Sequence, residues 1–452
     1  MKKILAAVLV LLTAVGVFSG CNLVEADDGN VVIATVNGVS ILKSDYNEIY
    51  NYWYYYLVNS YGYTADQATQ TLEGMSSDIL EQLIEEELIA QMAEKDGFLN
   101  YTQEDRDAAA AVINEDKQSY IESLVTQYKN AFEGQEVKGK NEGESDEDYF
   151  YRIAEQKYYK NLEDNGVTEE ELIQEQLKTA ALEKYQEDKV KDVTVLESDI
   201  VTEYEEQYNT QLEALSTDSA FVSAWNESTY KTLVYYRAGY SLVQHILISF
   251  EEEDQKTLQA YAETIAEYDE EINDYTADIE EETDEAKKAE YQQSLDRAKE
   301  EQAEYQQKYE EALAAAKAKI QDQTDEVYAS VKDADEDTFI SVMVEKTGDT
   351  GMKDADTAKK GYLVGPEDNM AEEFSQMGQS LEAGQIGEPV ATYYGYHIIR
   401  CIKKLNEGKV PYEDVKEEIQ QYLTETKKEE EWTAMIETWK TEAKIKKYPN
   451  KL

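Results

Sequence analysis

The chain has 452 residues, of which 41% are apolar, so it can form two to four domains with buried cores. Its 97 acidic residues outnumber 43 basic ones and give a formal net charge of −54. Such a surface repels nucleic acid and anionic lipid, which excludes functions that depend on phosphate contacts. The acids are spread along predicted helices, so solvated helix faces explain them most simply, and attraction of basic unfolded polypeptides is the alternative.

Residues 1–20 combine a two-lysine start with an apolar stretch and contain no acid. The apolar stretch is shorter than the roughly 20 residues of a membrane span, which indicates a secretory signal. Its ending, Phe18-Ser19-Gly20-Cys21, is similar to a lipobox. We therefore predict a lipoprotein signal peptide over 1–20, lipidation at Cys21 and a polar tether over 21–30; simple secretion is the alternative.

The predicted first domain opens with two short strands around Asn37-Gly38, a pair typical of a tight hairpin turn. Helical patterns with apolar residues three and four apart follow, and we expect helices to start after Ser44 and after Ser77. Thr102 and Thr168 each precede an acidic residue by three positions, which predicts two further helix starts. Residues 31–235 are therefore predicted to form a hairpin and a helical domain.

The pattern changes to strand from Tyr235, with a β-rich run that starts at Tyr240, and returns to strand at residues 389–392 and 397–402. Between them, apolar residues from Leu258 to Ile279 recur at alternating spacings of three and four, and the pattern resumes at Tyr291. This is typical of a coiled coil, so we predict an antiparallel helical hairpin inserted over 252–312. Such an arm would either grip client proteins or act as a spacer, and the sequence favours neither.

The chain has only two histidines, His245 and His397, and both lie in apolar, strand-like segments. Two histidines on neighbouring buried strands would form a polar pair at the floor of a site. The simpler alternative is that each is a satisfied core histidine. Cys401 is expected to be a small buried hydrophobe. With two histidines, one free cysteine and no ligand spacing, no metal site is predicted.

Several segments, which include the two histidines and the chain between them, occur in a recognisable order. They are Tyr240–Ile248, Thr347-Gly348-Asp349, Lys360-Gly361-Tyr362-Leu363, Met370–Phe374, Leu381–Val390 and Tyr394–Ile399. In this order they resemble the parvulin family of peptidyl-prolyl cis/trans isomerases. Nearly everything after Cys21 resembles the extracytoplasmic foldase lipoproteins of the PrsA type and their SurA-like relatives.

The resemblance implies an α+β fold with two parts. A helical SurA/PrsA-like foldase domain over 31–235 would be completed by a C-terminal helix within 406–452. A parvulin-like domain with a four-stranded antiparallel sheet would span 236–405 and carry the coiled-coil hairpin. We therefore expect truncation before Pro411 to destabilise the helical domain more than the isomerase domain.

The resemblance also implies the site. His245, Asp349 and His397 match the family's active-site residues, and Leu363, Met370, Phe374 and Tyr394 match its substrate-binding positions. Met370 and Phe374 are expected to lie four apart on one helix face. The chain departs from the family pattern where Gly361-Tyr362-Leu363-Val364 replaces the usual Gly-Asp-Leu-Gly.

The function implied is a lipid-anchored folding factor on the extracytoplasmic face of the cell membrane, of the Gram-positive type. It would isomerise X-Pro bonds in unfolded or partly folded secreted polypeptides, without a cofactor and without binding nucleic acid. A homodimer is left open. The alternative is a non-catalytic holdase chaperone with a vestigial parvulin domain.

Overall fold

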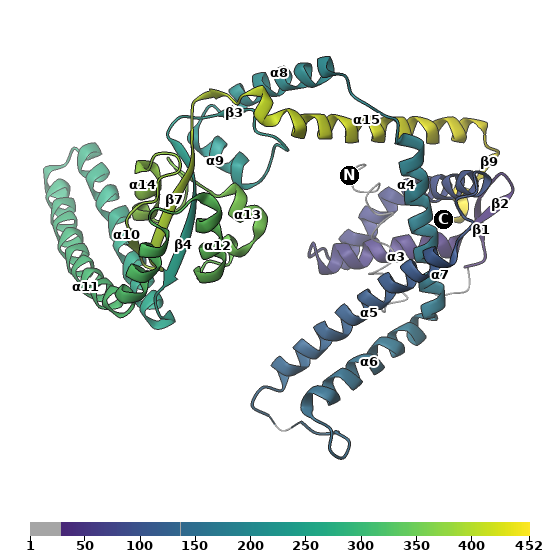
Figure 1. Ribbon diagram of the computed structural model, residues 1–452, viewed down its shortest axis with the longest axis horizontal. Coiled ribbons are helices and arrows are strands. Elements are labelled where there is room, and N and C mark those ends of the chain that lie inside the picture. The colour runs from purple at the N-terminus through teal and green to yellow at the C-terminus, as the bar shows by residue number, and fades with distance from the viewer. Residues whose placement is uncertain (1–28, 136) are drawn as a thin grey trace. The chain divides into compact units, whose positions relative to one another are not determined.

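The computed structural model describes residues 29–135 and 137–452, shown in Figure 1. The chain divides into two compact units, one formed by residues up to 194 together with 424–452, the other by 195–423. Long helices predominate and the sheets are small and antiparallel, so the expected α+β class is confirmed. The predicted signal peptide over 1–20, Cys21 and most of the tether over 21–30 lie outside the described residues.

Unit 1 contains a three-stranded sheet made from both ends of the chain. Its strands are β1 (Val32–Val36), β2 (Val39–Leu42) and β9 (Ile445–Lys447), in the order β2-β1-β9. β1 and β2 form the predicted hairpin, whose turn residues Asn37 and Gly38 both have positive φ, 53° and 97°. β9 closes the sheet by pairing antiparallel with β1.

Five helices follow the hairpin in unit 1: α3 (Lys43–Asn59), α4 (Ala65–Lys95), α5 (Gln103–Ala131), α6 (Asp146–Asn165) and α7 (Glu169–Val190). Thr102 and Thr168 cap α5 and α7 as predicted, each accepting a hydrogen bond from the backbone three residues on. The other two expected starts are wrong. α3 already begins at Lys43, and α4 begins at Ala65, where Thr64 and Gln67 form a capping box.

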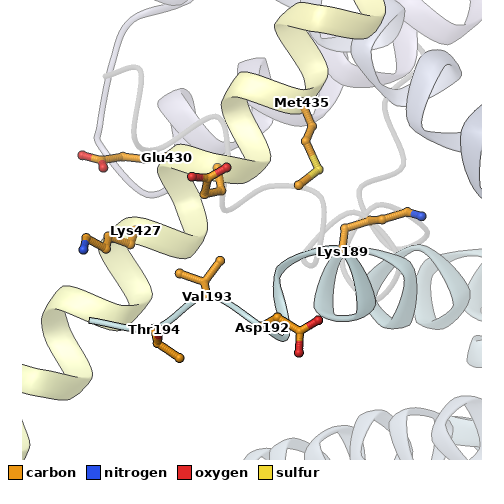
Figure 2. A pocket seen from close by; sticks show the side chains of 8 residues that line it. Lys189, Asp192, Val193, Thr194, Lys427, Glu430 and Met435 are labelled. Carbon is orange, nitrogen blue, oxygen red and sulfur yellow. The ribbon is translucent and has the colours of Figure 1, made fainter. Parts of the chain in front are cut away.

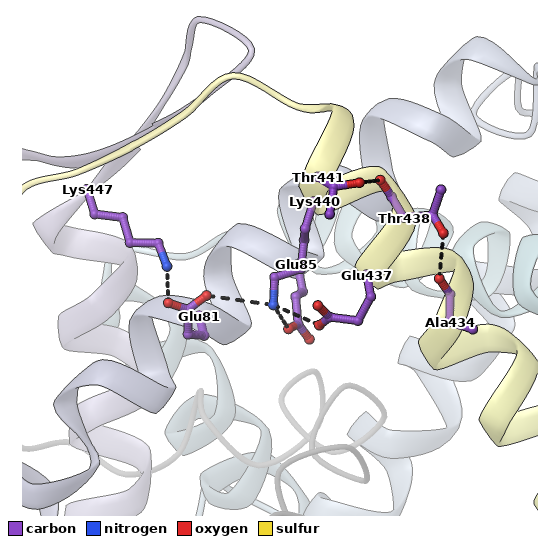
Figure 3. A network of polar contacts seen from close by, with 8 residues as sticks. All are labelled: Glu81, Glu85, Ala434, Glu437, Thr438, Lys440, Thr441 and Lys447. Carbon is purple, nitrogen blue, oxygen red and sulfur yellow. Dashed lines mark hydrogen bonds and ion pairs between the residues drawn. The ribbon is translucent and has the colours of Figure 1, made fainter.

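The last part of the chain completes unit 1. α15 (Tyr412–Glu442) is one continuous helix whose residues from 424 onward belong to unit 1. Trp432 and Ile436 are buried there against Ile89, Leu182 and Tyr185. At its end, Lys440 forms ion pairs with Glu81, Glu85 and Glu437, and Lys447 bonds Glu81 (Figure 3). Apolar packing and this charge network together join the two ends of the chain.

Unit 2 is built on the predicted four-stranded antiparallel sheet. Its strands run in the order β5 (Tyr362–Val364), β4 (Tyr240–Ser249), β7 (Gly395–Leu405) and β6 (Val390–Thr392). The central strands β4 and β7 are fully paired, with His245 opposite Ile399 and Leu247 opposite His397. A two-stranded sheet pairs β3 (Tyr235–Tyr236), which precedes β4 in sequence, with β8 (Gly408–Lys409), which follows β7.

Helices cover both faces of the four-stranded sheet because its central strands are apolar on both sides. α14 (Glu372–Ser380) places Phe374 against Val243, Ile399 and Cys401. On the other face, α12 (Glu336–Lys346) packs Phe339 and Met343 against Ile246 and Ile398. The short helices η4 (Gly351–Lys353) and α13 (Ala355–Lys360) lead from α12 into β5.

The inserted hairpin consists of α10 (Glu252–Glu281) and α11 (Glu285–Val331), which lie side by side in Figure 1. Tyr261 and Tyr268 of α10 both contact the ring of Tyr305 on α11, along the predicted seam. The hairpin does not end near residue 312. α11 continues to Val331, and its last turns pack on the sheet through Val327 and Val331.

Two boundaries differ from those expected. The units divide after Thr194 and not after residue 235, because α8 (Glu197–Ala214) and α9 (Asp218–Asn226) belong to unit 2. α9 buries Phe221 and Trp225 against Tyr240 and Leu242 of β4. The first turns of α15 also lie in unit 2, where Ile419 packs against Ile200 and Val234.

Candidate functional site

The two histidines lie on the same face of the four-stranded sheet. Because their register positions differ by two residues, His245 on β4 and His397 on β7 are diagonal neighbours on one face. Their Nδ1 atoms are 3.1 Å apart and their ring centroids 5.0 Å apart. Both side chains are buried, with 3% and 5% of the residue exposed. The structure therefore brings together the two histidines that were expected to form a pair.

Further partners extend the histidine pair into a chain of hydrogen bonds. His245 Nε2 lies 2.8 Å from Asp349 Oδ2, and His397 Nε2 lies 2.8 Å from the hydroxyl of Thr392 on β6. With both rings neutral, one arrangement satisfies every ring nitrogen. Thr392 donates to His397, His397 Nδ1–H donates to His245 Nδ1, and His245 Nε2–H donates to the Asp349 carboxylate.

The charge states at the site agree with this direction. Burial and, to a smaller extent, the nearby His245 lower the pKa of His397 to about 3, so His397 is neutral at physiological pH. The hydrogen bond from His245 lowers the pKa of Asp349 to about 2, so Asp349 is ionised and accepts.

Asp349 is itself held by its neighbours. Its Oδ1 accepts the Gly351 N–H at 2.8 Å, and its Oδ2 accepts the Tyr362 hydroxyl at 3.0 Å. Burial and the charge of Asp349 raise the pKa of Tyr362, which keeps that hydroxyl a donor. Thr347 Oγ1 accepts the backbone N–H of Asp349 at 3.2 Å and that of Leu247 on β4 at 3.0 Å. These bonds fasten the loop after α12 to the strand that carries His245.

An apolar wall stands beside the polar chain. Phe374 on α14 is buried, and its ring lies edge-on at 5.0 Å from both imidazoles. Leu381 is buried in the same cluster, with the half-buried Met377 packed against it. The site thus combines an aromatic wall with a floor of two buried imidazoles, which an ionised carboxylate holds in place.

The structure does not place every expected substrate contact as predicted. Leu363 pairs with Leu242 and is buried in the cluster around Tyr240, on the face opposite the histidines, so it does not stand beside Phe374. Met370 precedes α14, whose N-cap is Ala371, so Met370 and Phe374 do not share a helix face. Met370 is 37% exposed and Tyr394, in the β6–β7 turn, is 45% exposed.

Three polar residues of the site, Thr347, Tyr362 and Thr392, were not predicted. Tyr362 stands where the family pattern has aspartate, and its strand position, two residues before Val364, gives it the face that Leu363 lacks. Thr392 could have been found from the β6–β7 turn, since Val390 pairs with His397 and Thr392, two residues further along β6, shares the face of Val390. Thr347 carries no local signal beyond its place next to Gly348.

The described residues contain no group of three or more histidine, cysteine, aspartate or glutamate side chains placed to hold a metal ion. A cavity of about 470 Å³ lies in unit 1, between the end of α7 and α15 (Figure 2). Charged side chains such as Lys189, Asp192 and Glu430 line it, and none of the predicted site residues does. Within the described part of the chain, no helix is long and apolar enough to cross a membrane.

Two protein-family models match the chain. Residues 1–117 match a SurA-like N-terminal domain, and residues 303–403 match the PPIC-type peptidyl-prolyl isomerase domain. The second match contains Asp349, Phe374 and His397, whereas His245 lies ahead of it, across the inserted hairpin. The chain therefore joins a SurA-like N-terminal domain to a parvulin-type isomerase domain.

Relatives that match parts of the chain carry the name foldase protein PrsA. One from Clostridium botulinum (strain Okra / Type B1) is 38% identical over 124 residues, 26% of this chain and 35% of the relative. One from Clostridium perfringens is 32% identical over 93 residues, 20% of this chain and 27% of the relative. The chain thus spans about a third of the length of the curated relatives it matches.

Solved structures that resemble the chain include PrsA from Bacillus subtilis, at 16% identity and a TM-score of 0.24, covering 91% of this chain and 93% of that one. A SurA-like chaperone structure from Campylobacter jejuni has 13% identity and a TM-score of 0.20, covering 72% and 94%.

Proposed function

We propose that the protein is a folding factor that catalyses cis/trans isomerisation of X-Pro peptide bonds in secreted polypeptides. The observation that carries the proposal is the buried chain Thr392–His397–His245–Asp349 beneath the ring of Phe374. An apolar ring can hold a proline ring, and a hydrogen-bonded polar floor next to it can favour the twisted peptide bond. We assign His245, His397 and Asp349 to that floor and Phe374 to the proline pocket.

The chemistry makes few demands on the site. Rotation about an X-Pro bond crosses a barrier of about 18–20 kcal/mol and takes tens to hundreds of seconds without a catalyst. No bond is made or broken, so neither a nucleophile nor a cofactor is required. What the pocket must do is bind the twisted amide, with its reduced resonance, more tightly than the planar cis or trans form. Each 1.4 kcal/mol of such preference is worth about tenfold in rate.

The test is an isomerisation assay on X-Pro peptides with the chain from residue 22 onward and its His245→Ala, His397→Ala and Phe374→Ala variants. We expect catalysis by the wild type, and a loss of about tenfold or more in kcat/KM for each variant, equivalent to about 1.4 kcal/mol. Circular dichroism should show each variant folded. A wild type with no activity above the uncatalysed rate would rule out the isomerase function.

We place this folding factor on the extracytoplasmic face of the membrane, held by lipid at Cys21, with unfolded secreted polypeptides as clients. The support is the lipobox-like sequence before Cys21 and the polar residues that follow it. In a Gram-positive host, metabolic labelling with a radioactive fatty acid should mark the wild type and not Cys21→Ala. The variant should appear unlabelled in the medium. Equal labelling of both would refute the anchor.

A non-catalytic holdase is the second candidate. Four tyrosines at the end of α3 and in the loop after it are exposed, namely Tyr55, Tyr56, Tyr61 and Tyr63. The rings of Tyr56, Tyr61 and Tyr63 follow one another at 5.3 and 6.5 Å. Exposed aromatic patches of this kind bind apolar segments of other proteins. Suppression of client aggregation that persists in the double variant His245→Ala/His397→Ala, with an inactive wild type, would favour this function.

A further inference from the structure

One residue of the site departs from the pattern of the parvulin family, namely the tyrosine at position 362. It replaces the aspartate of the usual Gly-Asp-Leu-Gly segment, so a hydroxyl donor stands where the family has an acceptor. Tyr362 lies on β5, an edge strand of the sheet, opposite Val243 of β4. Its side chain is half-buried, and its ring centroid lies 5.7 Å from that of His245. A tyrosine on the edge strand thus reaches the histidine pair.

The Tyr362 hydroxyl donates to the same carboxylate oxygen that accepts from His245. Asp349 Oδ2 lies 3.0 Å from the Tyr362 hydroxyl and 2.8 Å from His245 Nε2. The other oxygen, Oδ1, accepts the Gly351 N–H at 2.8 Å. Gly351 belongs to the same stretch of loop as Asp349, whereas Tyr362 reaches the carboxylate from a strand of the sheet. Tyr362 therefore ties the Asp349 side chain to the sheet that carries both histidines.

A glycine leaves the space that the tyrosine hydroxyl occupies. A Cβ at Gly351 would overlap the Tyr362 hydroxyl, and it would lie 3.3 Å from Asp349 Oδ1 and 3.4 Å from Tyr362 Cζ. The backbone at Gly351 does not itself require glycine, because its φ is not positive. The reason for a glycine here is therefore steric, and the atom that a side chain would displace first is the Tyr362 hydroxyl.

We propose that Tyr362 is a positioning residue for the isomerisation and that Gly351 provides the room its hydroxyl needs. Tyr362 acts on the substrate through Asp349, which accepts the Nε2–H of His245 and so leaves His245 Nδ1 as the acceptor for His397. Burial and the charge of Asp349 raise the pKa of Tyr362, so its hydroxyl remains a donor. This inference rests on the proposed isomerase function, and it adds a residue that the family pattern does not supply.

Two substitutions remove the same hydrogen bond in different ways. Tyr362→Phe removes the hydroxyl and keeps the ring, whereas Gly351→Ala displaces the hydroxyl and keeps the backbone N–H that Asp349 accepts. In the chain from residue 22 onward, we expect each to lower kcat about three- to tenfold, the effect of one hydrogen bond. KM should stay within about twofold, because Phe374 still forms the proline pocket.

The double variant Tyr362→Phe/Gly351→Ala tests whether the two residues act as a pair. Once the hydroxyl is absent, a methyl group at position 351 has little left to displace. We therefore expect the double variant to be no worse than either single variant, which is the non-additive result of a shared interaction. Losses that multiply in the double variant would show that the two residues act independently and would overturn the pairing.

A matched control removes another tyrosine hydroxyl from the same sheet. The Tyr396 hydroxyl on β7 donates to Gln321 of α11 at 2.8 Å, and Tyr396 packs on the face opposite that of its neighbour His397. Urea unfolding should show a similar loss of stability in Tyr396→Phe and Tyr362→Phe, but kcat should stay within about twofold of the wild type in the control. An equal fall of kcat in the control would indicate a general loosening of unit 2 and would overturn the positioning role.

Imidazole NMR keeps this inference distinct from the isomerase function, because it does not depend on turnover. The chain has two histidines, so the ring signals of isotope-labelled histidine fall into two sets. The Nε2–H signal of His245 should shift and broaden through faster exchange with water in Tyr362→Phe and Gly351→Ala, and not in Tyr396→Phe. If this occurs although the wild type turns over no peptide, the isomerase function fails and the role of Tyr362 in holding Asp349 against His245 stands. An unchanged His245 signal in Tyr362→Phe would overturn that role whatever the activity.

Discussion

At the scale of single residues, the site depends on a histidine that stays neutral. His397 has a pKa of about 3 because it is buried beside a second imidazole, whereas a histidine in the unfolded chain titrates near 6.5. Between these values the unfolded chain binds a proton that the folded chain does not. The free energy of unfolding therefore rises with pH through this window and is level above it.

This predicts a pH-dependent difference between the wild type and His397→Gln. From pH 4 to 6 the stability of unit 2 in the wild type should rise by up to about 1.4 kcal/mol per pH unit more than in the variant, the value for one proton. Urea unfolding at a series of pH values measures it. A constant offset between wild type and variant at every pH would contradict the assigned burial.

Thr392 offers a second prediction, because it holds the far end of the hydrogen-bonded chain. Thr392→Val keeps the shape and removes the donor to His397 Nε2, at a cost of about 0.5–1.5 kcal/mol for a lost hydrogen bond. We expect isomerase kcat/KM to fall about three- to tenfold. Thr392→Ser restores a hydroxyl and should recover most of the activity, whereas equal losses in both variants would indicate a packing effect.

At the scale of secondary-structure elements, α15 has two buried segments, and each packs in a different unit. Trp432 is buried in unit 1 and Ile419 in unit 2. Trp432→Ala should destabilise unit 1 by about 3–5 kcal/mol, and Ile419→Ala should destabilise unit 2 by about 2–5 kcal/mol. Hydrogen exchange resolved by unit measures both. If either substitution lowers the protection of both units equally, the assignment of the two segments of α15 to separate units is wrong.

The helices with the clearest apolar periodicity were predictable from the sequence, but the residues at which they begin and end were not. The alternation of three and four predicts the seam of α10 and α11, yet no glycine or proline marks where α11 passes from the arm onto the sheet. The start of α4 was missed although Thr64 and Gln67 carry its capping signal, since Ser76 and Ser77 offered a second apparent start. Packing of α8 and α9 on β4 has no local signal at all.

Part of the site could likewise be predicted from the sequence, and part could not. The histidines, Asp349 and Phe374 were named from sequence, and the structure brings them together. The expected position of Leu363 beside Phe374 was wrong because a shift of one residue on a strand reverses the face, so Tyr362 takes the position toward the site. The shared helix face of Met370 and Phe374 was wrong because the spacing of four assumed a helix that begins only at Glu372.

At the scale of the whole molecule, the shared helix changes the expected effect of truncation. Removing everything from Pro411 onward takes Val415 and Ile419 out of unit 2 as well as Trp432 and Ile436 out of unit 1. We now expect both units to lose stability. Truncation after Leu423 should affect unit 1 alone. Separate melts of the two units would test this, and identical behaviour of unit 2 in both truncations would contradict it.

The pairing of β1 with β9 has a consequence for the order of folding. Val36 pairs with Ile445, so some 400 residues must be synthesised after β1 before its partner β9 exists. At 5–20 residues per second this takes about 20–80 s, longer than most small domains need to fold. Residues 195–423, which form unit 2, are all available earlier. Unit 1, whose first residues are synthesised first, is therefore the last unit that can complete its fold.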